Sequence, residues 1–389
     1  MNSRLRDRAP PQRLQPLFAS PPPSRPVTVI RGRGAVSNPA GRYEQLDRVP
    51  VADGWPSSEE GAAQAPVPTL RTEVTEERSR SIISYNQSPD VPFDRAVNPY
   101  RGCEHGCTYC FARPGHAWLG LSPGLDFETR LRAKPDAPNR LRQELAAPGY
   151  RCAPINLGSA TDVYQPIERD WRITRQIIEV LAECSHPLTL VTKSALVERD
   201  IDLLAPMAHR GLVRVYITLT TVDPELARAW EPRAAAPWRR LRTMRRLSDA
   251  GIPVGVLVAP VVPFLNEPEL ERVLQQAAGH GACSASYTVL RLPLELREIF
   301  TDWLRTTYPE RAERVLNRLS DMRPAGRAGE PRLNDPRFHH RMRGEGGWAE
   351  LLRLRFELAA RRLGLERHRP VLRTDLFVPP GDRRQGVLF

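Results

Sequence analysis

The sequence lacks any run of about 18 apolar residues, so it predicts no membrane-spanning helix and no membrane partner. Its first residues carry arginine without an apolar stretch, and we therefore expect no secretory signal there. Cysteine is scarce, with three of the six clustered and three scattered at Cys152, Cys184 and Cys283. That is not the regular spacing of a secreted disulfide scaffold. We expect a cytoplasmic protein in which the scattered cysteines are core thiols.

Lysine is almost absent, since Lys134 and Lys193 stand against 55 arginines. The formal net charge of +12 suits a nucleic-acid partner, although the excess of arginine is equally typical of a genome-wide codon bias. The excess does single out the two lysines. Lysine at these two positions indicates that a compact ammonium is required where the planar guanidinium of arginine would not serve.

Residues 1–90 are rich in Pro, Ser and Arg and show little periodicity. They predict an N-terminal arm, disordered from Arg4 to Pro26. The stretch from Gly32 to Tyr43 is expected to form an ordered part of this arm that packs on the core.

From residue 91 to 296, short β-branched runs alternate with helical patterns, which indicates a parallel sheet of βα units. Eight such units close a full barrel, so six predict an open, partial (β/α)6 barrel of the α/β class. Residues 297–389 predict a helical C-terminal extension with a last helix at Trp348–Leu363 and an extended tail. The expected strands are Arg95–Tyr100, Pro154–Gly158, Leu188–Thr192, Val213–Leu219, Val254–Ala259 and Ser286–Leu290. The expected helices are Pro138–Ala147, Pro166–Cys184, Glu198–Arg210, one ending near Ala250, and Glu267–Gly279.

The strongest chemical signal is the spacing C-x3-C-x2-C formed by Cys103, Cys107 and Cys110. Three thiolates on one short loop can bind three irons of a cubane and leave the fourth iron open. An open iron distinguishes a catalytic cluster from an electron-transfer cluster with four Cys ligands. Gly102 and Gly106 allow the loop to turn tightly.

A structural zinc site of the Cys3His type is the alternative, with His105 or His116 as the fourth ligand. Zinc knuckles usually pair two C-x2-C units, and no second pair follows here. The loop also comes directly after the first expected strand, where the active sites of barrels lie. The pattern therefore favours an iron–sulfur cluster over zinc.

The cysteine motif resembles the signature of the radical S-adenosylmethionine (radical SAM) superfamily, C-x3-C-x-aromatic-C, with Tyr109 at the aromatic position. More narrowly, residues from about Phe93 to Pro293 are similar to the spore photoproduct lyase-like group. The matching text is Asn98-Pro-Tyr-Arg-Gly-Cys103 through Phe111-Ala-Arg-Pro114, Phe127-Glu-Thr129 with Lys134, Thr161-Asp162 with Tyr164-Gln-Pro166 and Glu168, and Thr192-Lys193.

The resemblance implies a [4Fe-4S] cluster on the three cysteines, with S-adenosylmethionine (SAM) chelating the open iron. Reductive cleavage of SAM would then yield a 5′-deoxyadenosyl radical that abstracts hydrogen from the substrate. A reductant protein such as flavodoxin or ferredoxin is also implied. Resemblance and charge together suggest a nucleic-acid substrate.

The resemblance also assigns roles by position. Tyr109 would lie near the adenine, and Lys193 would pair with the methionine carboxylate as a compact ammonium. Thr161, with Asp162, would hold the methionine end or the ribose. The full set of expected cofactor-binding residues is Tyr109, Ser159, Thr161, Asp162, Lys193, Thr218 (with Thr220 as the alternative) and Ala259.

Two positions depart from the lyase. Its C-T-S-D run, whose cysteine returns a hydrogen atom to the product radical, is replaced by a run that begins at Ser159. A serine O–H bond is too strong for that step. The lyase also has a tyrosine directly after the third cluster cysteine, where this chain has Phe111. We therefore expect no repair of spore photoproduct.

The last residues, Gln385 to Phe389, resemble the short peptide with which bacterial repair and replication proteins dock on the sliding clamp. Gly386 departs from the usual leucine, and a frayed tail is the alternative. His339 and His340 are candidates for contact with substrate or phosphate, although such a pair more often forms a solvated turn.

Two other classes of protein stay open at this point. A zinc-dependent nucleic-acid-binding module without catalysis would be colourless and need no reductant. A clamp-associated scaffold whose cluster only senses redox state would be coloured and leave SAM intact.

Overall fold

The computed structural model describes residues 29–44, 70–324, 332–365 and 371–381. Its main sheet has seven strands in the order β10-β9-β8-β7-β6-β3-β2. Strands β3, β6, β7, β8, β9 and β10 run parallel to one another, and β2 pairs antiparallel with β3. Since β2 and β10 are the two edges, the sheet forms an open, partial barrel, as expected. The strand bounds are β2 Ile83–Tyr85, β3 Arg95–Val97, β6 Ile155–Leu157, β7 Leu188–Thr192, β8 Val213–Thr218, β9 Val254–Val261 and β10 Ser284–Val289.

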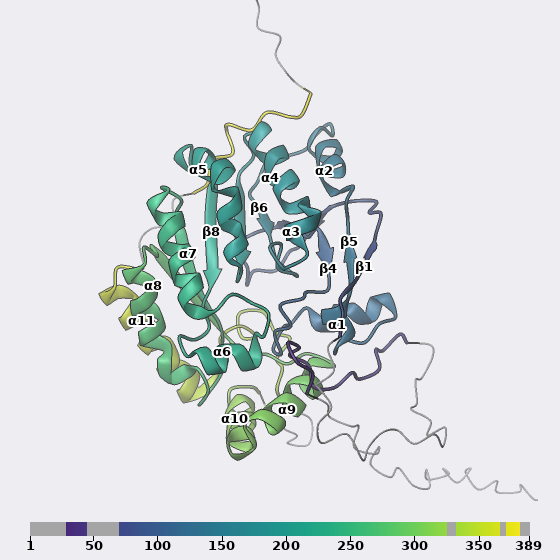
Figure 1. Cartoon of the computed structure of the whole chain (residues 1–389). Coiled ribbons are helices and arrows are strands. Elements are labelled where there is room, and N and C mark those ends of the chain that lie inside the picture. Colours follow the sequence, from purple (N-terminus) through teal and green to yellow (C-terminus); the bar gives the residue numbers. More distant parts are fainter. Residues whose placement is uncertain (1–28, 45–69, 325–331, 366–370, 382–389) are drawn as a thin grey trace, which may run out of the picture.

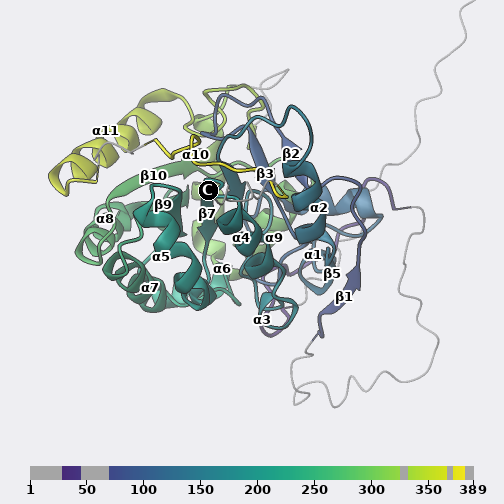
Figure 2. The same ribbon diagram turned by 90° about the horizontal axis from the view of Figure 1, so that it is seen from above.

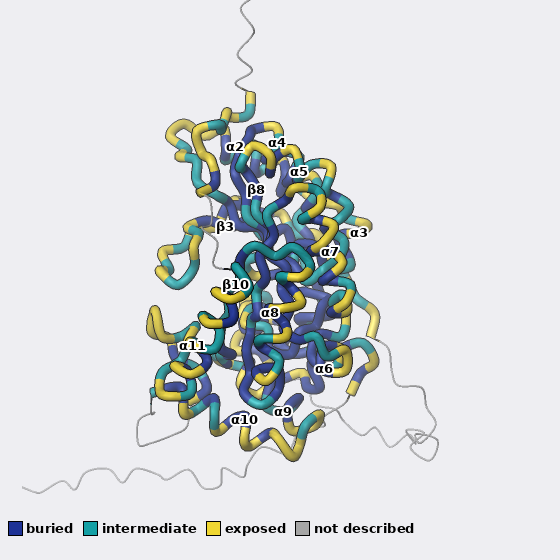
Figure 3. The backbone as a smooth tube through the Cα atoms, turned by 90° about the vertical axis from the view of Figure 1, so that its left-hand side faces the viewer, coloured by how far each residue is buried: buried dark blue, intermediate teal, exposed yellow. Residues whose placement is uncertain are grey.

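A layer of helices covers one side of this curved sheet (Figure 2). In α4, for example, Ile173, Ile177 and Leu181 recur at helical spacing and are fully buried against the strands. The strands themselves are buried along most of their length, whereas the helices alternate buried and exposed residues (Figure 3). The bounds of the covering helices are α2 Ala137–Leu145, α4 Ile173–Glu183, α5 Ile201–His209, α7 Pro237–Asp249 and α8 Leu270–Gly279.

A second sheet of three short strands stands beside the first, in the order β1-β5-β4. Its strands are β1 Glu73–Glu76, β4 Tyr100–Arg101 and β5 Arg130–Ala133. The cysteine loop leaves β4, so this small sheet anchors the loop at its first residue. The sequence did not predict β1, β2, β4 or β5 as separate strands.

Further helices gather at the end of the sheet toward which β8 runs (Figure 1). They are α1 Asp126–Thr129, α6 Pro224–Trp230, α9 Leu296–Thr307 and α10 Pro309–Asp321. The last helix, α11 Gly346–Arg362, packs against α8 beside the edge strand β10. Short turns of helix complete the structure: the 3-10 helices η2 Arg113–Leu119, η3 Ala195–Asp200 and η4 Glu267–Glu269, and the α-helix α3 Glu168–Trp171.

Each of the six expected strands is present, with ends shifted by up to three residues. The single helix expected at Pro166–Cys184 is wrong, because Arg172 adopts a left-handed conformation (φ 52°) and divides it into α3 and α4. The Glu168 carboxylate accepts hydrogen bonds from the amides of Thr174 (3.0 Å) and Arg175 (3.3 Å). It therefore caps the start of α4, and a second helix begins where periodicity alone suggested continuation.

The remaining expectations concern the N-terminal arm, the last helix and the C-terminal tail. The arm from Gly32 to Tyr43 is ordered on the core, and α11 lies within two residues of the helix expected at its position. Residues 371–381 contain neither helix nor strand, and the amide of Val378 donates to the carbonyl of Cys184 (2.9 Å). The region Arg4 to Pro26 and the peptide Gln385 to Phe389 lie outside the described residues.

Within the described ranges, no helix combines the length and the apolar character that crossing a membrane requires.

Candidate active site

The three clustered cysteines lie on one loop between β4 and η2. Cys103 and Cys107 are buried, Cys110 is half-buried, and all three are free thiols. The loop is a series of tight turns, in which the amide of Gly106 donates to Cys103 O (3.3 Å) and the amide of Cys110 donates to Cys107 O (3.3 Å). Gly102 and Gly106 adopt the positive φ that these turns need, at 75° and 65°.

Gln165 fixes the first part of this loop. Its Oε1 accepts from the amide of Glu104 (2.9 Å), and its Nε2 donates to the carbonyl of Gly102 (3.2 Å). The two backbone groups flank Cys103, so one buried side chain holds the backbone on both sides of the first thiol.

A buried ion pair holds the second part of the loop. The guanidinium of Arg113 is fully buried against the carboxylate of Glu128. It also donates to the carbonyls of Cys107 (2.9 Å) and Gly106 (3.1 Å). These contacts explain why a charge can be buried here, because Arg113 finds acceptors on several sides.

The N-terminal arm packs on this same ion pair. The amides of Gly34 (2.9 Å) and Ala35 (2.8 Å) donate to the two oxygens of Glu128. Gly34 lies so close to the cysteine loop that a Cβ atom there would overlap the carbonyl oxygen of Gly106. A segment about 70 residues upstream in the sequence thus forms one wall of the loop.

Burial dominates the electrostatics of the thiols. Burial and the nearby Asp162 carboxylate raise the pKa of Cys103 well above its usual value. Burial likewise raises the pKa of Cys107 to about 12, although the ammonium of Lys193 acts in the opposite direction. Deprotonating these thiols in place therefore requires a strong positive partner such as iron.

The hydroxyl of Tyr109 belongs to a buried polar network. Its hydroxyl donates to the carboxylate of Glu231, which also accepts from Thr220 Oγ1 (2.9 Å) and pairs with Arg240. Burial would raise the pKa of Glu231, but Arg240 and Lys193 outweigh it and lower that pKa. The network fixes the Tyr109 ring next to the cysteines.

Lys193 is the first residue after β7, and its Nζ lies 5.8 Å from the centroid of the Tyr109 ring. Burial alone would lower the pKa of Lys193, but the Cys107 thiol once it ionises and the carboxylates of Glu231 and Asp162 outweigh it and raise that pKa. The side chain is therefore a protonated, half-buried ammonium beside the thiols.

Asp162 joins the cysteine loop to the end of β7. Its carboxylate accepts from Thr192 Oγ1 (2.7 Å) and from the amide of Lys193 (2.7 Å). One of its oxygens lies 3.2 Å from His105 Nδ1 on the cysteine loop. Burial would raise the pKa of Asp162, but His105 and the hydrogen bonds to the carboxylate lower it below its usual range. Both oxygens of Asp162 therefore already have partners within the protein.

The other expected cofactor residues lie at the same end of the sheet. Ser159 Oγ accepts from Asn98 Nδ2 (2.9 Å), and Thr161 Oγ1 donates to the carbonyl of Tyr100 (3.2 Å). Thr218 is the buried last residue of β8, and Ala259 is a half-buried residue of β9. The structure thus brings residues from four successive parallel strands or their carboxyl ends toward the cysteine loop.

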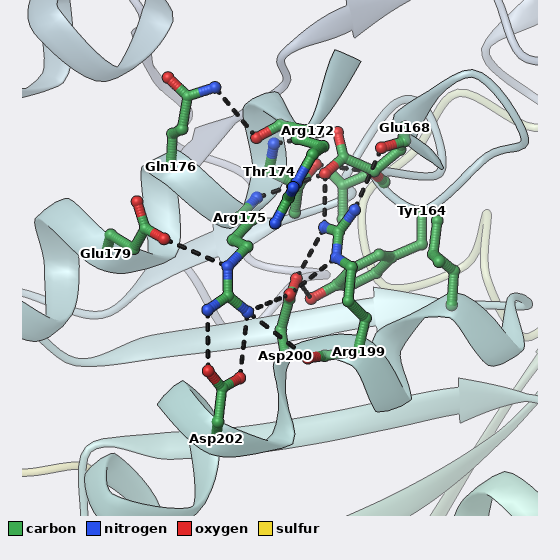
Figure 4. A network of polar contacts seen from close by, with 12 residues as sticks. Tyr164, Glu168, Arg172, Thr174, Arg175, Gln176, Glu179, Arg199, Asp200 and Asp202 are labelled. Atoms are coloured by element: carbon green, nitrogen blue, oxygen red, sulfur yellow. Dashed lines mark hydrogen bonds and ion pairs between the residues drawn. The ribbon is translucent and has the colours of Figure 1, made fainter. Parts of the chain in front are cut away.

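Behind the loop, Glu168 and Asp200 form the centre of a buried charge network (Figure 4). Arg199 pairs with both carboxylates, at 2.7 Å and 2.8 Å. Tyr100, three residues before Cys103, donates its hydroxyl hydrogen to Glu168, and Tyr164 donates to Asp200 (2.9 Å). The network therefore ties the start of the cysteine loop to α3 and η3.

A cavity of about 370 Å³ opens beside the loop at the carboxyl end of β3 and β6. Its lining includes Gly102, Thr161 and Lys134. Lys134 follows β5, and its Nζ donates to the carbonyl of Asn98 (3.3 Å). Both lysines of the chain therefore lie next to the cysteine loop, one on each side.

The donor set fits an iron–sulfur cluster better than zinc. Three thiols on one loop are the usual ligands of a cubane, and each would bind a different iron. A zinc site of the Cys3His type would need His105 or His116 as the fourth ligand of the metal ion. His105 faces Asp162 instead, and His116 stacks edge-to-face on Phe127 with its pKa lowered by burial to about 4.

The remaining candidates lie elsewhere. Cys184 is buried, Cys152 and Cys283 are half-buried, and the three stay apart as free thiols. His339 and His340 are exposed, and His340 Nδ1 lies 2.6 Å from Glu345. The histidine pair therefore forms a solvent-exposed turn, and a contact with substrate stays a prediction.

Comparison with known proteins agrees with this geometry. A family model described as "Radical SAM superfamily" matches residues 97–277. An uncharacterized protein of Mycobacterium tuberculosis is 38% identical over 226 residues, which cover 58% of this chain and 66% of that protein. The match thus spans just under two thirds of that relative's length. A second uncharacterized protein, from Methanocaldococcus jannaschii, is 24% identical over 250 residues, covering 64% of this chain and 89% of the relative.

Among solved structures, a spore photoproduct lyase with a tyrosine-to-phenylalanine substitution superposes with a TM-score of 0.53. The two chains are 16% identical, and the alignment covers 75% of this chain and 80% of the lyase. At this identity the likeness concerns the fold. Residues 97–277 thus resemble the radical SAM superfamily, and the fold is like that of spore photoproduct lyase.

Several site residues had no assigned role in the sequence. Glu231 and Arg240 lie more than 120 residues from Tyr109, and no local pattern marks them. Gln165 and Glu128 did carry a signal, because both fall within the text shared with the spore photoproduct lyase-like group. Their side chains hold the backbone of the loop, which a sequence pattern does not specify.

Proposed function

We propose that this protein is a radical SAM enzyme that binds one [4Fe-4S] cluster through Cys103, Cys107 and Cys110. When bound, the cluster would supply the electron that cleaves SAM to methionine and a 5′-deoxyadenosyl radical, which takes a hydrogen atom from the substrate. The observation that carries the proposal is the set of three thiols on one clamped loop, with the Lys193 ammonium and the Tyr109 ring beside them. The match of residues 97–277 to the radical SAM family model supports it independently.

Different residues of the site would contact different parts of SAM. The Lys193 ammonium would pair with the methionine carboxylate, and the fixed Tyr109 ring would contact the adenine. Thr161, Thr218 and Ala259 would form the walls of the pocket. Asp162, whose oxygens already accept hydrogen bonds from β7 and face His105, would orient the loop rather than the cofactor.

The reaction would differ from that of spore photoproduct lyase in how the product radical is quenched. Ser159 replaces the hydrogen-donating cysteine, and its hydroxyl oxygen accepts a hydrogen bond from Asn98. Phe111, which follows the third cysteine, has no hydroxyl and is half exposed. The substrate radical would therefore receive its hydrogen atom from another source, or SAM would be regenerated.

The substrate and partners are further parts of the proposal. The net charge of +12 and the resemblance to the spore photoproduct lyase-like group support a nucleic-acid substrate. A flavodoxin or ferredoxin would reduce the cluster, and Gln385 to Phe389 would dock on a sliding clamp. A cytoplasmic location is supported by the six free thiols.

The test uses anaerobically purified and reconstituted protein. We expect dithionite-dependent formation of 5′-deoxyadenosine from SAM by the wild type and none by Cys107→Ala. A brown protein that leaves SAM intact would favour the redox-sensing scaffold. A colourless protein that retains zinc would overturn the proposal.

A further inference from the structure

The cavity beside the cysteine loop has a lining with positive charge and no negative charge. Lys134 and Arg101 are its cations, and none of its lining residues is Asp or Glu. Its volume of about 370 Å³ falls in the range of small-molecule sites. The Cys-flanking residue Gly102 and the expected cofactor residue Thr161 belong to the same lining, so the cavity borders the proposed site of chemistry.

Lys134 has no ion-pair partner among the described residues. Its Nζ is half-buried and donates only to the carbonyl of Asn98 (3.3 Å). Burial, together with the positive charge of Arg101, lowers the pKa of Lys134. Arg101 forms an ion pair with Glu77 through its Nε (3.0 Å). Glu77 and Asp136 oppose this lowering of the pKa from a distance, but neither forms an ion pair with Lys134 among the described residues. An anion in the cavity would therefore meet an ammonium that is available for a direct ion pair.

His116 also lines the cavity, and its side chain is 2% exposed. Burial lowers the pKa of His116 to about 4, so its ring is neutral at pH 7. Lys134 and Arg101 therefore supply the positive charge of the lining.

The rest of the lining is largely apolar. Ile82, Leu119 and Phe127 contribute hydrocarbon surface, while Ser81, Ser84 and Asn98 add polar groups. Such a wall suits an organic body that carries an anionic group at one end. It is less suited to a small, fully hydrated ion.

We propose that this cavity is the substrate subsite of the enzyme and that it binds a phosphate monoester, with Lys134 as the phosphate-binding cation. The assignment rests on the proposed radical SAM function, and it narrows the substrate to a molecule with a terminal phosphate on a partly apolar body, such as a nucleotide. Lysine suits a phosphate as a compact point charge, and a monoester carries up to two negative charges at neutral pH. Lys193, on the other side of the loop, would remain free for SAM.

The experiment measures binding by calorimetry under anaerobic conditions with cluster-loaded, full-length protein. The probes are thymidine 5′-monophosphate and thymidine, which differ only in the phosphate. We expect the wild type to bind the monophosphate at least about tenfold more tightly than thymidine, and Lys134→Met to lose this preference. Arg130→Met is the matched control, because it removes one positive charge from the neighbouring β5 at a residue outside the lining and should keep the preference.

Three results would overturn the assignment. The wild type could show no preference for the monophosphate, or Arg130→Met could abolish the preference as fully as Lys134→Met does. In a parallel titration with SAM, Lys134→Met could lose as much affinity as Lys193→Met, which would assign Lys134 to SAM. Failure of the proposed function would look different, since the wild type would then keep its phosphate preference but form no 5′-deoxyadenosine.

Discussion

At the scale of single residues, Tyr109 is held by its hydroxyl as well as by its ring. The hydroxyl donates to Glu231, a carboxylate that is 2% exposed and also serves Thr220 and Arg240. Tyr109→Phe would leave that buried carboxylate one donor short. We expect a loss of about 1–3 kcal/mol in the free energy of unfolding, measured by urea denaturation. Tyr43→Phe alters an exposed ring stacked on Trp118 and should change stability far less; equal losses would contradict the role of the network.

Lys193 gives the second prediction at this scale. Lys193→Met removes the ammonium but keeps much of the side-chain volume, so the cluster should form with unchanged visible absorption. We expect SAM affinity to fall by roughly tenfold or more, because one charge-assisted hydrogen bond is lost. Equilibrium binding of SAM under anaerobic conditions would measure this. Unchanged SAM affinity would remove Lys193 from the site.

The sequence could predict site residues of two kinds. The cysteines form a contiguous motif, and Lys193 stands out because an ammonium is so rare in this chain. Glu231 and Arg240 could not be predicted, because their importance comes from meeting Tyr109 across the fold and being buried there. A carboxylate and a guanidinium in a charged, helical stretch of sequence look like surface residues until the packing is known.

At the scale of elements, the segment between β6 and α3 supports the cysteine loop through Gln165. Gln165→Ala would free the carbonyl of Gly102 and the amide of Glu104. We expect the fold to persist while the reconstituted protein loses iron several times faster to a chelator, followed by absorbance. Gln176→Ala is the control, since its side chain is an exposed glutamine on α4 (Figure 4). Equal iron loss in the two variants would show that Gln165 does not position the loop.

The junction of α3, α4 and η3 depends on Glu168. Its carboxylate pairs with Arg199 and caps α4, while Glu179 on the same helix makes an exposed pair with Arg175 at 3.2 Å. Glu168→Gln should lower the free energy of unfolding by about 1–3 kcal/mol, because it removes the buried charge that pairs with the half-buried Arg199 and weakens the hydrogen bonds that cap α4. Glu179→Gln should change it by less than about 1 kcal/mol. Denaturant titrations of both variants would test the contrast, and similar values would contradict it.

The strands that the sequence predicted all belong to the parallel part of the main sheet. Strands β7, β8 and β9 are rich in β-branched residues and largely buried in a parallel sheet, and this pattern is visible in the sequence. Strands β1, β2, β4 and β5 have two to four residues and exist because a neighbour pairs with them. The break at Arg172 depends on the Glu168 cap, so the periodic apolar pattern continued across it.

At the scale of the whole molecule, the N-terminal arm connects distant parts of the chain. Gly34 packs on the cysteine loop, Ser37 Oγ donates to Asp302 on α9 (2.9 Å), and Arg42 pairs with Glu295 (2.6 Å). Gly34→Ala would place a methyl group against the carbonyl of Gly106. We expect a loss of about 1–3 kcal/mol in stability and faster loss of iron to a chelator. Gly279→Ala, at the end of α8 with nothing within 4 Å of the new methyl group, should be neutral; parity between the two would contradict the close approach.

The arm also sets an order of events during biosynthesis. Residues 33–42 are made before the cysteine loop, whereas Glu295 and Asp302, to which Arg42 and Ser37 are joined, are made long after it. The contacts that fasten the arm to α9 and its start can therefore form only after the loop has been synthesised. Iron delivered in that interval would reach the thiols before the arm is fully fastened.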